Sequence, residues 1–267
     1  MRKLFAFLKR DFLAILSYRF RLFLNFGSLL AGVFFLFFIG QTFRDSFSQY
    51  LARYGNDYFA FALIGMTVST FVSTGLSSLA DQVRSAQVEG TLEALLVTPT
   101  SANMILFGNS LWTFVESFME SVLYLALAIV IIGLNVSIVQ IGLVLLILAL
   151  TFLCFLALGM ISAAFIMAFK QGNPIGLLFG TSSYFLGGLL FPVDVLPAPL
   201  QTVSFFLPMT HASKAVREIL LVPGGQGDWL STFTFLAVFS ILTLPIGFLL
   251  LRLSLSRAKR EGSLVQF

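Results

Sequence analysis

Two pairs of glutamates, each spaced four residues apart, are the side chains of this sequence best placed to bind a charged partner or to line a polar path. Glu89 and Glu93 lie in a short polar stretch between two long apolar runs, and Glu116 and Glu120 lie within the second run. Residues four apart share one face of a helix. Each pair therefore presents two carboxylates together, which suits ion pairing with Lys or Arg.

Other kinds of chemistry lack the residues they need. One histidine, His211, and one cysteine, Cys154, cannot supply a histidine-rich metal site or the triad of a nucleophilic enzyme. No Gly-Lys dipeptide occurs, so there is no phosphate-binding loop for ATP. We therefore expect a chain that is not an enzyme and holds no cofactor or metal. The sequence favours packing for Cys154, and a capping or interfacial role for His211 over a proton relay.

The composition indicates a membrane protein. Hydrophobic residues make up 58% of the 267 residues and charged residues 10%, with 32 phenylalanines. A soluble domain usually has about 25% charged residues, so much of the apolar surface must face lipid. The net charge of +4 indicates attraction to anionic lipid headgroups, and no partner nucleic acid, because Lys and Arg cluster at the two ends of the chain.

Six segments are long and apolar enough to cross a bilayer, which takes about 20 such residues. We therefore expect an all-α integral membrane protein, with residues 22–267 forming one membrane domain. The expected spans are 22–43, 58–80, 104–132, 138–169, 174–191 and 229–251. A break at residues 133–137 divides an uncharged run too long for one helix, and Pro174 suits the first turn of the fifth span.

The distribution of positive charge predicts the orientation. Of the 16 Lys and Arg residues, 12 lie in the two termini and in the loops after the second and fourth spans. The positive-inside rule then places both termini and residues 81–101 in the cytoplasm. We expect a multi-pass protein of the plasma (inner) membrane.

Two further segments are neither spans nor simple loops. Residues 1–21 place apolar side chains on one helical face, which predicts an amphipathic helix in the cytoplasmic interface; the alternative is an ordinary basic flank of the first span. Residues 192–228 contain Pro192, Pro197 and Pro208 between apolar pieces too short to span. They predict short re-entrant or interfacial helices, which would suit an outer gate.

Residues 81–101 predict a short helix lying on the membrane surface. Val83, Val88 and Leu92 belong to a helix-like apolar face, and Thr98-Pro99 stops the helix. Such a helix would be exposed to a soluble partner.

Two stretches carry a resemblance to a known family. Residues 88–101 (VEGTLEALLVTPTS), and residues 187–197 (GGLLFPVDVLP) with 207–217 (LPMTHASKAVR), resemble the permease subunit of an ABC-2 type ATP-binding-cassette exporter. The likeness extends over nearly the whole chain. It implies a homodimer or heterodimer of permease subunits with two cytoplasmic ATPase subunits, which bind the ATP and Mg. Residues 81–101 would be the coupling helix flanked by the N-terminal helix, and residues 192–228 the outer gate.

The candidate site residues follow from these expectations. For coupling to the ATPase they are Glu89, Gly90, Thr91, Leu92, Glu93, Thr98 and Pro99. For the substrate path or gate they are Glu116, Glu120, Pro192, Pro197, Pro208, His211 and Arg217.

Several of these residues have an alternative interpretation. Glu89 and Glu93 could form a solvated face near Arg84, and Gly90 could allow close backbone approach or be a tolerated helix defect. Glu116 and Glu120 could line the path or pair with basic residues near the cytoplasmic headgroups. For Lys214, Arg217 and Glu218, surface ion pairing is the default and lining the exit for an anion the alternative.

The leading functional hypothesis is a permease subunit that exports a hydrophobic or amphipathic, lipid-like or drug-like, substrate. The alternatives are a polysaccharide or lipid-linked glycan permease of the same family, an ion-coupled secondary transporter, and a membrane scaffold. Secondary transporters often show inverted repeats and charges within spans, neither of which is prominent here. A co-purifying ATPase would separate the first hypothesis from the last two.

Overall fold

The computed structural model describes residues 2–17, 19–42, 50–90, 102–169, 172–222 and 229–261, and it contains only helices and connecting turns within these ranges. The described helices range from single short turns to rods of more than 30 residues. They are α1 (Arg2–Ser17), α2 (Arg19–Thr42), η1 (Ala52–Tyr54), α4 (Tyr58–Val88), α6 (Ala102–Ile132), α7 (Ile138–Phe169), α8 (Pro174–Leu186), η2 (Val193–Val195), α9 (Ala198–Phe205), α10 (Pro208–Leu221) and α11 (Trp229–Glu261).

Five of the described helices are long and apolar enough to cross a membrane, whereas the sequence predicts six spans. The five lie in α2, α4, α6, α7 and α11. The segment expected as the fifth span, residues 174–191, forms α8, which has only 13 residues. At about 1.5 Å per residue it is roughly 20 Å long, shorter than the 30 Å hydrocarbon core. The prediction of six spanning helices is therefore not confirmed.

The early end of α8 has a local cause. The helix begins at Pro174, where the side chain of Asn173 accepts a hydrogen bond from the backbone N–H of Gly176 at 2.6 Å. It ends before a glycine pair whose second member, Gly188, has a φ of +71°. Such backbone is left-handed and is strained for most side chains. Counting apolar residues alone misses this stop, because Gly187 and Gly188 interrupt neither the charge-free run nor its hydropathy.

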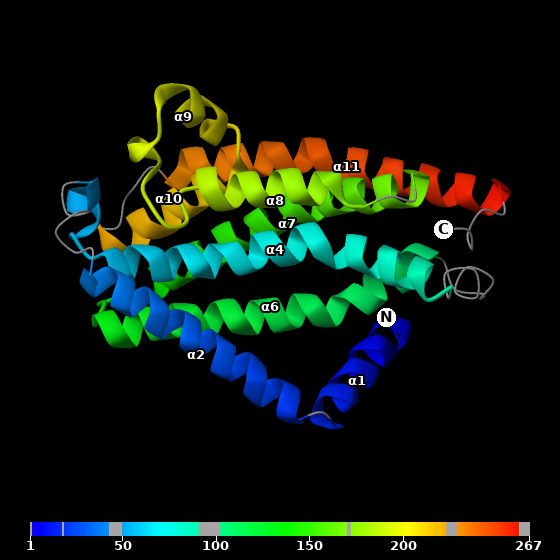
Figure 1. Ribbon diagram of the computed structural model, residues 1–267, viewed down its shortest axis with the longest axis horizontal. Helices are drawn as coiled ribbons and strands as arrows, with labels where there is room; N and C mark the ends of the chain where they lie inside the picture. The colour runs from blue at the N-terminus through cyan, green and yellow to red at the C-terminus, as the bar shows by residue number, and fades with distance from the viewer. Residues whose placement is uncertain are drawn as a thin grey trace.

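The helices form an elongated bundle with α4 at its centre (Figure 1). The N-terminal end of α1 and the C-terminal ends of α4 and α11 lie at one end of the bundle, which we call the terminal end. The short helices α9 and α10 lie near the opposite end. This arrangement separates the two regions expected to be functional by the length of α4.

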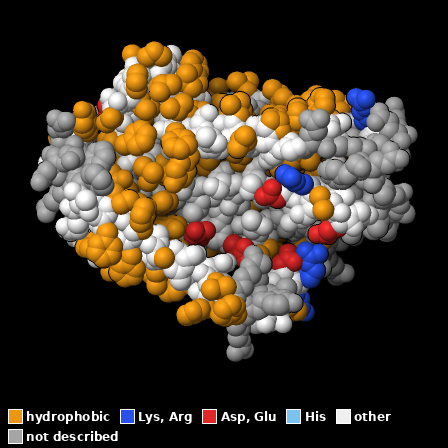
Figure 2. Space-filling view, viewed as in Figure 1, with side chains coloured by type: hydrophobic (Ala, Val, Ile, Leu, Met, Phe, Trp, Pro, Cys, Tyr) orange, Lys and Arg blue, Asp and Glu red, His pale blue; other side chains and the backbone are white. Residues whose placement is uncertain are grey.

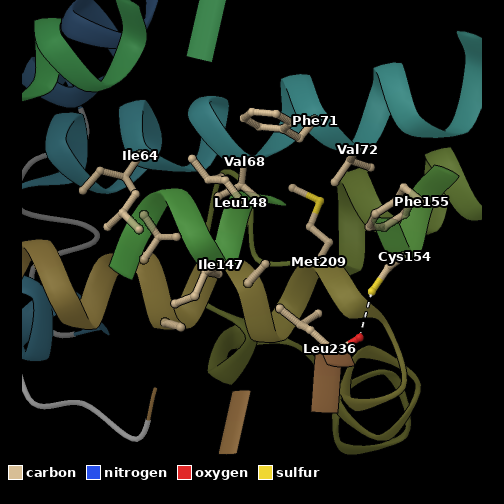
Figure 3. Packing of buried hydrophobic residues seen from close by; sticks show 14 of the residues in the cluster. Ile64, Val68, Phe71, Val72, Ile147, Leu148, Cys154, Phe155, Met209 and Leu236 are labelled. Atoms are coloured by element: carbon tan, nitrogen blue, oxygen red, sulfur yellow. Dashed lines mark hydrogen bonds between the residues drawn. The ribbon is translucent and has the colours of Figure 1, made fainter. Parts of the chain in front are cut away.

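The main core joins α4 to α7, α10 and α11 (Figure 3). Cys154 is buried there, and its thiol donates to the carbonyl oxygen of Leu236 at 3.4 Å, which links α7 to α11. Buried side chains from the four helices interdigitate around this contact. They include Ile64, Val68, Phe71, Val72, Ile147, Leu148, Phe155 and Met209.

Hydroxyl groups hold α6 against α4. Ser117 Oγ donates to the carbonyl oxygen of Thr70 at 3.1 Å, and Ser121 Oγ donates to that of Thr67 at 3.2 Å. Thr70 Oγ1 and Ser121 Oγ are also hydrogen-bonded to each other. Small polar residues let membrane helices approach closely and hydrogen-bond across their interface. This seam fixes the rotation of α6, and with it the direction in which Glu116 and Glu120 point.

Several helix ends differ from the expected ranges. α4 runs to Val88 and α11 to Glu261, past the expected span ends at 80 and 251. The N-terminal helix ends at Ser17, and α2 begins at Arg19, three residues before the expected span. α6 ends at Ile132 and α7 begins at Ile138, on either side of the stretch at which the sequence predicts a break.

Candidate functional site

The polar segment after the second apolar run does not start a separate helix. Residues 81–88 are the last two turns of α4, which continues without interruption from Tyr58 to Val88. Nothing between Ala80 and Val88 breaks a helix, so the polar residues extend the rod beyond the apolar part. Val83 is fully buried in the bundle while Val88 is 69% exposed. The expectation of an independent surface helix that starts at residue 81 is wrong for this part.

Gly90 ends α4. It has a φ of +66°, and its N–H donates to the carbonyl oxygen of Gln87 at 3.1 Å. A Cβ at this position would meet no atom of the described residues within 4 Å. Gly90 is therefore not a defect inside a helix; it is the left-handed residue that follows a helix end. Glu89 is exposed beside it. The other expected coupling residues, Thr91, Leu92, Glu93, Thr98 and Pro99, lie outside the described residues.

At the opposite end, prolines set the boundaries of three short helices. Pro192 precedes η2, Pro197 precedes α9, and Pro208 is the first residue of α10. Proline suits the first turn of a helix, where its missing N–H leaves no hydrogen bond unmade. We call the segment from η2 to α10, residues 193–221, the outer unit. Its two longer helices, of 8 and 14 residues, are each too short to span.

Arg217 fastens the outer unit to α4. Its guanidinium donates from Nε to the carbonyl oxygen of Phe61 at 3.1 Å, from Nη1 to that of Gly188 at 2.6 Å and from Nη2 to that of Leu189 at 2.9 Å. Its Cζ also lies 3.4 Å from the centroid of the Phe61 ring. Because α8 stops early, the carbonyls of Gly188 and Leu189 need donors from elsewhere, and the guanidinium supplies them.

The burial of Arg217 excludes the position expected from the sequence. The side chain is 2% exposed, and Glu218 is 3% exposed, so neither lies on the surface; Lys214 on the same helix is exposed. Desolvation lowers the pKa of the Arg217 guanidinium to about 9, which still leaves it cationic at neutral pH. Arg217 therefore holds the turn after α8, α10 and α4 together, and its donors face backbone carbonyls within the protein.

His211 is half-buried between the outer unit and α11. Its ring is stacked on Phe235 of α11, with centroids 3.9 Å apart, and its Nε2 donates to the carbonyl oxygen of Phe205 at 2.7 Å. A carbonyl can only accept, so the contact fixes the proton on Nε2. Burial lowers the pKa of His211 below its usual 6.5. The capping or interfacial role expected for His211 stays a prediction.

Because folding lowers the pKa of His211, the protein should become less stable as the pH decreases. The contribution of His211 is fully present above about pH 6.5 and is lost as the pH drops below that value, where the unfolded chain binds the proton first. We expect the melting temperature to fall between pH 7 and 5.5, and to fall less in His211→Phe, which keeps the stack on Phe235. Thermal unfolding of detergent-purified protein across this range measures the difference. An equal fall in both proteins would contradict the role given to His211.

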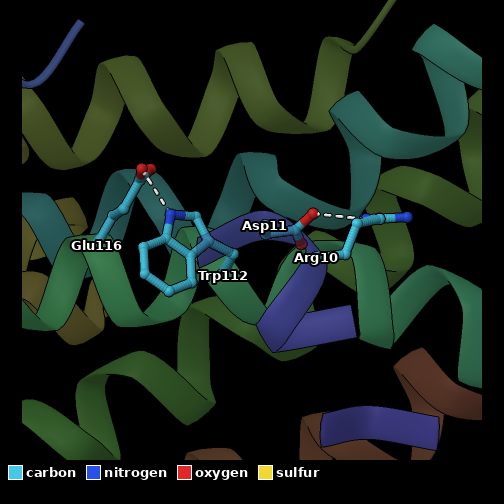
Figure 4. Close-up of polar contacts among 4 residues, drawn as sticks. All are labelled: Arg10, Asp11, Trp112 and Glu116. Atoms are coloured by element: carbon cyan, nitrogen blue, oxygen red, sulfur yellow. Dashed lines mark hydrogen bonds and ion pairs between the residues drawn. The ribbon is translucent and has the colours of Figure 1, made fainter. Parts of the chain in front are cut away.

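Glu116 and Glu120 lie halfway along α6. Glu116 is half-buried and accepts a hydrogen bond from Trp112 Nε1 at 2.7 Å (Figure 4). Glu120, one turn further on, is exposed. Figure 2 shows acidic and basic side chains together where α1, α4 and α6 meet, and hydrophobic side chains gathered over the side toward α9. The structure thus separates the pair: Glu116 has an indole partner, and Glu120 is the more open carboxylate.

Another side of α6 borders an apolar groove. Its volume is 310 Å³, and it runs between α4, α6 and α7. Four phenylalanines and three aliphatic side chains line it: Phe71, Phe114, Phe118, Phe152, Leu145, Ala149 and Leu153. α6 therefore carries an apolar groove and two carboxylates on different sides.

Sequence reasoning missed three residues that organise these regions. Trp112 was not singled out, although its place four residues before Glu116 is a signal for a contact along α6. Gly188 was quoted in the family resemblance but not used to end the fifth span. Phe61, the partner of Arg217, lies 156 residues away in the sequence, and no local pattern could connect the two.

Comparison with known proteins identifies one family of transporters. The sequence model of the ABC-2 type transporter family matches residues 2–221. The chain is 31% identical to nodulation protein J of Rhizobium leguminosarum bv. trifolii over 179 residues, which are 62% of this chain and 63% of that protein. It is 28% identical to nodulation protein J of Sinorhizobium fredii (strain NBRC 101917 / NGR234) over 202 residues, 74% and 76% of the two chains. The match thus spans less than two thirds of the length of the first of these relatives.

Proposed function

This chain belongs to the ABC-2 type transporter family and is a multi-pass membrane protein with five apolar helices long enough to span; from that premise we propose that it is the membrane-embedded subunit of an exporter. The energy comes from ATP hydrolysed, with Mg, on a separate ATPase chain. The chain contributes the translocation path and the surface on which the ATPase acts.

The observation that carries this proposal is the continuity of α4. The helix has 31 residues, which at about 1.5 Å per residue makes a rod of roughly 46 Å. One end of the rod leads directly into residues 91–101, the expected contact with the ATPase. Near the other end, the Phe61 carbonyl accepts the hydrogen bond from Arg217. A push on one end therefore reaches the outer unit without passing through a flexible joint.

The mechanism follows from this geometry. ATP binding closes the ATPase dimer and moves the segments after α4 of two permease subunits together. Each α4 tilts and carries α10 and the turn after α8 with it, because Arg217 holds all three. The outer units then separate and open a path between the subunits. Closure of the outer units after hydrolysis restores the resting state.

The partners and orientation in this proposal follow the distribution of charge. The termini and residues 81–101 face the cytoplasm, where the ATPase binds, and the outer unit lies on the far side of the plasma (inner) membrane. The N-terminal end of α1 and the C-terminal end of α4 both lie at the terminal end of the bundle (Figure 1), which agrees with one cytoplasmic face. The second permease subunit is identical or closely similar.

We propose an amphipathic substrate with a lipid-like part. The groove lined by Phe71, Phe114, Phe118 and Phe152 is apolar, and it suits an acyl chain or another hydrophobic group. Glu120 is exposed elsewhere on α6 and would meet a polar or cationic headgroup. Transport of a lipid-linked glycan is the alternative within the family, and the assay below includes it.

Purification from native membranes under mild detergent tests the proposal. We expect an ATP-binding-cassette ATPase to co-purify with the tagged chain, and the complex in proteoliposomes to move a fluorescent phospholipid or a lipid-linked glycan only when ATP is added. Transport that depends on a proton gradient, with no ATPase present, would instead favour an ion-coupled transporter.

A further inference from the structure

The N-terminal helix α1 packs closely on α6 at Gly108, which has no side chain. The ring of Phe7 lies over Gly108, so that a Cβ built on Gly108 would be 2.6 Å from Phe7 Cδ2 and 3.0 Å from Phe7 Cγ. Real Cβ atoms essentially never come as close as 2.6 Å to a ring carbon, so the ring of Phe7 would have to leave its position over Gly108 to admit one. Gly108 is therefore a notch that the ring of Phe7 fills.

A second contact lies one turn further along α6. The rings of Phe12 and Trp112 have centroids 5.9 Å apart and are inclined at 55°, within the range of favourable aromatic pairs. The indole N–H of Trp112 donates to Glu116 Oε1 at 2.7 Å (Figure 4). Positions 108, 112 and 116 are four residues apart and form one stripe of α6, which we call the α1 anchor.

Helix α2, which follows α1 in the sequence, packs against α1 less closely than the α1 anchor of α6 does. The N-terminal half of α2 points its large side chains outward: Phe20 and Phe23 are each 71% exposed, whereas Leu29 and Val33, further along, are buried. Figure 1 shows α2 diverging from the bundle where it meets α1, while the other end of α1 returns to α6. The position of α1 is therefore set by α6, although α2 is its covalent neighbour.

We propose that α1 and α6 move as one body during transport, with Gly108 and Trp112 as the contact and Glu116 as the positioning residue that fixes the indole. The inference rests on the proposed function for its consequence: a force on α1 at the cytoplasmic face reaches α6 directly, in parallel with the path through α4. Glu116 then serves the mechanical contact, which leaves Glu120 as the carboxylate available to a substrate.

A disulfide between the two helices tests the rigid contact. Cysteines at positions 7 and 108, in a Cys154→Ala background, would have Cβ atoms within about 4.5 Å, which a disulfide can bridge. We expect rapid cross-linking on mild oxidation, an equal yield with and without ATP, and unchanged ATP-driven transport after cross-linking. No cross-link, or transport arrested by the cross-link and restored by reductant, would overturn the proposal.

Substitutions separate the anchor from general stability. Gly108→Leu should leave the complex assembled and its basal ATPase intact but lower transport by roughly 2- to 30-fold, the range for a contact removed from a coupling path. The matched control is Gly27→Leu in α2, where a Cβ meets nothing within 4 Å among the described residues.

A second pair of variants tests the role of Glu116. Glu116→Leu should lower transport, whereas Glu116→Gln, whose amide oxygen still accepts from the indole, should retain it. Equal effects of Gly108→Leu and Gly27→Leu, or no rescue by glutamine, would overturn the proposal.

A spectroscopic measurement keeps this proposal distinct from the proposed function. In a Trp229→Phe background, Trp112 is the one remaining tryptophan. Phe12→Ala should change its fluorescence emission whether or not an ATPase is present, because the indole loses its ring partner. Unchanged emission would contradict the anchor, even in a complex that transports. A changed emission in a chain that binds no ATPase would support the anchor and count against the exporter.

Discussion

Replacing Arg217 by methionine is expected to destabilise the protein by about 2–6 kcal/mol, because two buried backbone carbonyls lose their donors at a cost of about 1–3 kcal/mol each. The substitution leaves the carbonyls of Gly188 and Leu189 without the donors that they have in the structure. Methionine has nearly the length of the arginine stem but no donor, so packing is disturbed less than hydrogen bonding. Thermal unfolding in detergent measures the loss, and transport should be abolished because α10 no longer follows α4.

Two variants of the same helix sharpen this prediction. Lys214→Met removes an exposed cation of α10 and should change stability by at most about 0.5 kcal/mol. Arg217→Lys keeps the charge, but an ammonium group lacks the planar fork of donors that reaches three carbonyls. The stability of this variant should therefore lie between those of Arg217→Met and Lys214→Met. Equal stability of Arg217→Met and Lys214→Met would show that the outer unit is held by other contacts.

Gly90→Val is expected to uncouple ATP hydrolysis from transport while the protein still inserts and folds. A β-branched residue is strained at a φ of +66°, so the chain after α4 would leave in a different direction. The expected result is a complex with basal ATPase activity and a transport rate lower by at least about tenfold, since residues 91–101 would reach the partner wrongly oriented. Parallel assays of ATPase and transport measure the effect.

Asparagine at the same position is the matched comparison. It accepts left-handed backbone far better than valine does, so Gly90→Asn should retain most of the transport. A Cβ at Gly90 meets nothing within 4 Å among the described residues, so a steric clash with that part of the chain does not explain a difference between the two. Full coupling in Gly90→Val would mean that the direction of the chain after Val88 is unimportant.

Much of the helical layout could be read from the sequence because long apolar runs in a bilayer leave the backbone little choice. With no water to satisfy N–H and C=O groups, such runs become helices. The break between α6 and α7 and the starts of η2, α9 and α10 lie at glycine and proline residues, which interrupt a helix or suit its first turn. These features are local, and a local pattern is sufficient to predict them.

The errors came from positions where hydropathy and backbone geometry disagree. The run of residues 174–191 has the hydropathy of a span, but the left-handed Gly188 stops α8 inside it. Conversely, the expected second span ends at residue 80 and a separate helix is expected from residue 81, but charged residues extend a helix as well as apolar ones do, and α4 continues to Val88.

The contacts of the candidate site could be predicted least, because they join distant parts of the chain. Arg217 looked like a surface cation, since its neighbours Lys214 and Glu218 made a helical pair plausible. Its real partners are carbonyls exposed by the end of α8 and the start of α4, and these become acceptors only once the fold is known. The aromatic contact of Phe12 with Trp112 is of the same kind, because it joins α1 to α6.

Labelling of a single cysteine placed at Glu93, in a Cys154→Ala background, tests the account most directly. A membrane-impermeant maleimide should react with it in inside-out vesicles and fail to react in right-side-out vesicles or intact cells. Addition of the ATPase subunit should then protect the thiol, because the segment after α4 is the surface on which the motor acts. Labelling from the outer side, or equal labelling with and without the ATPase, would contradict the account.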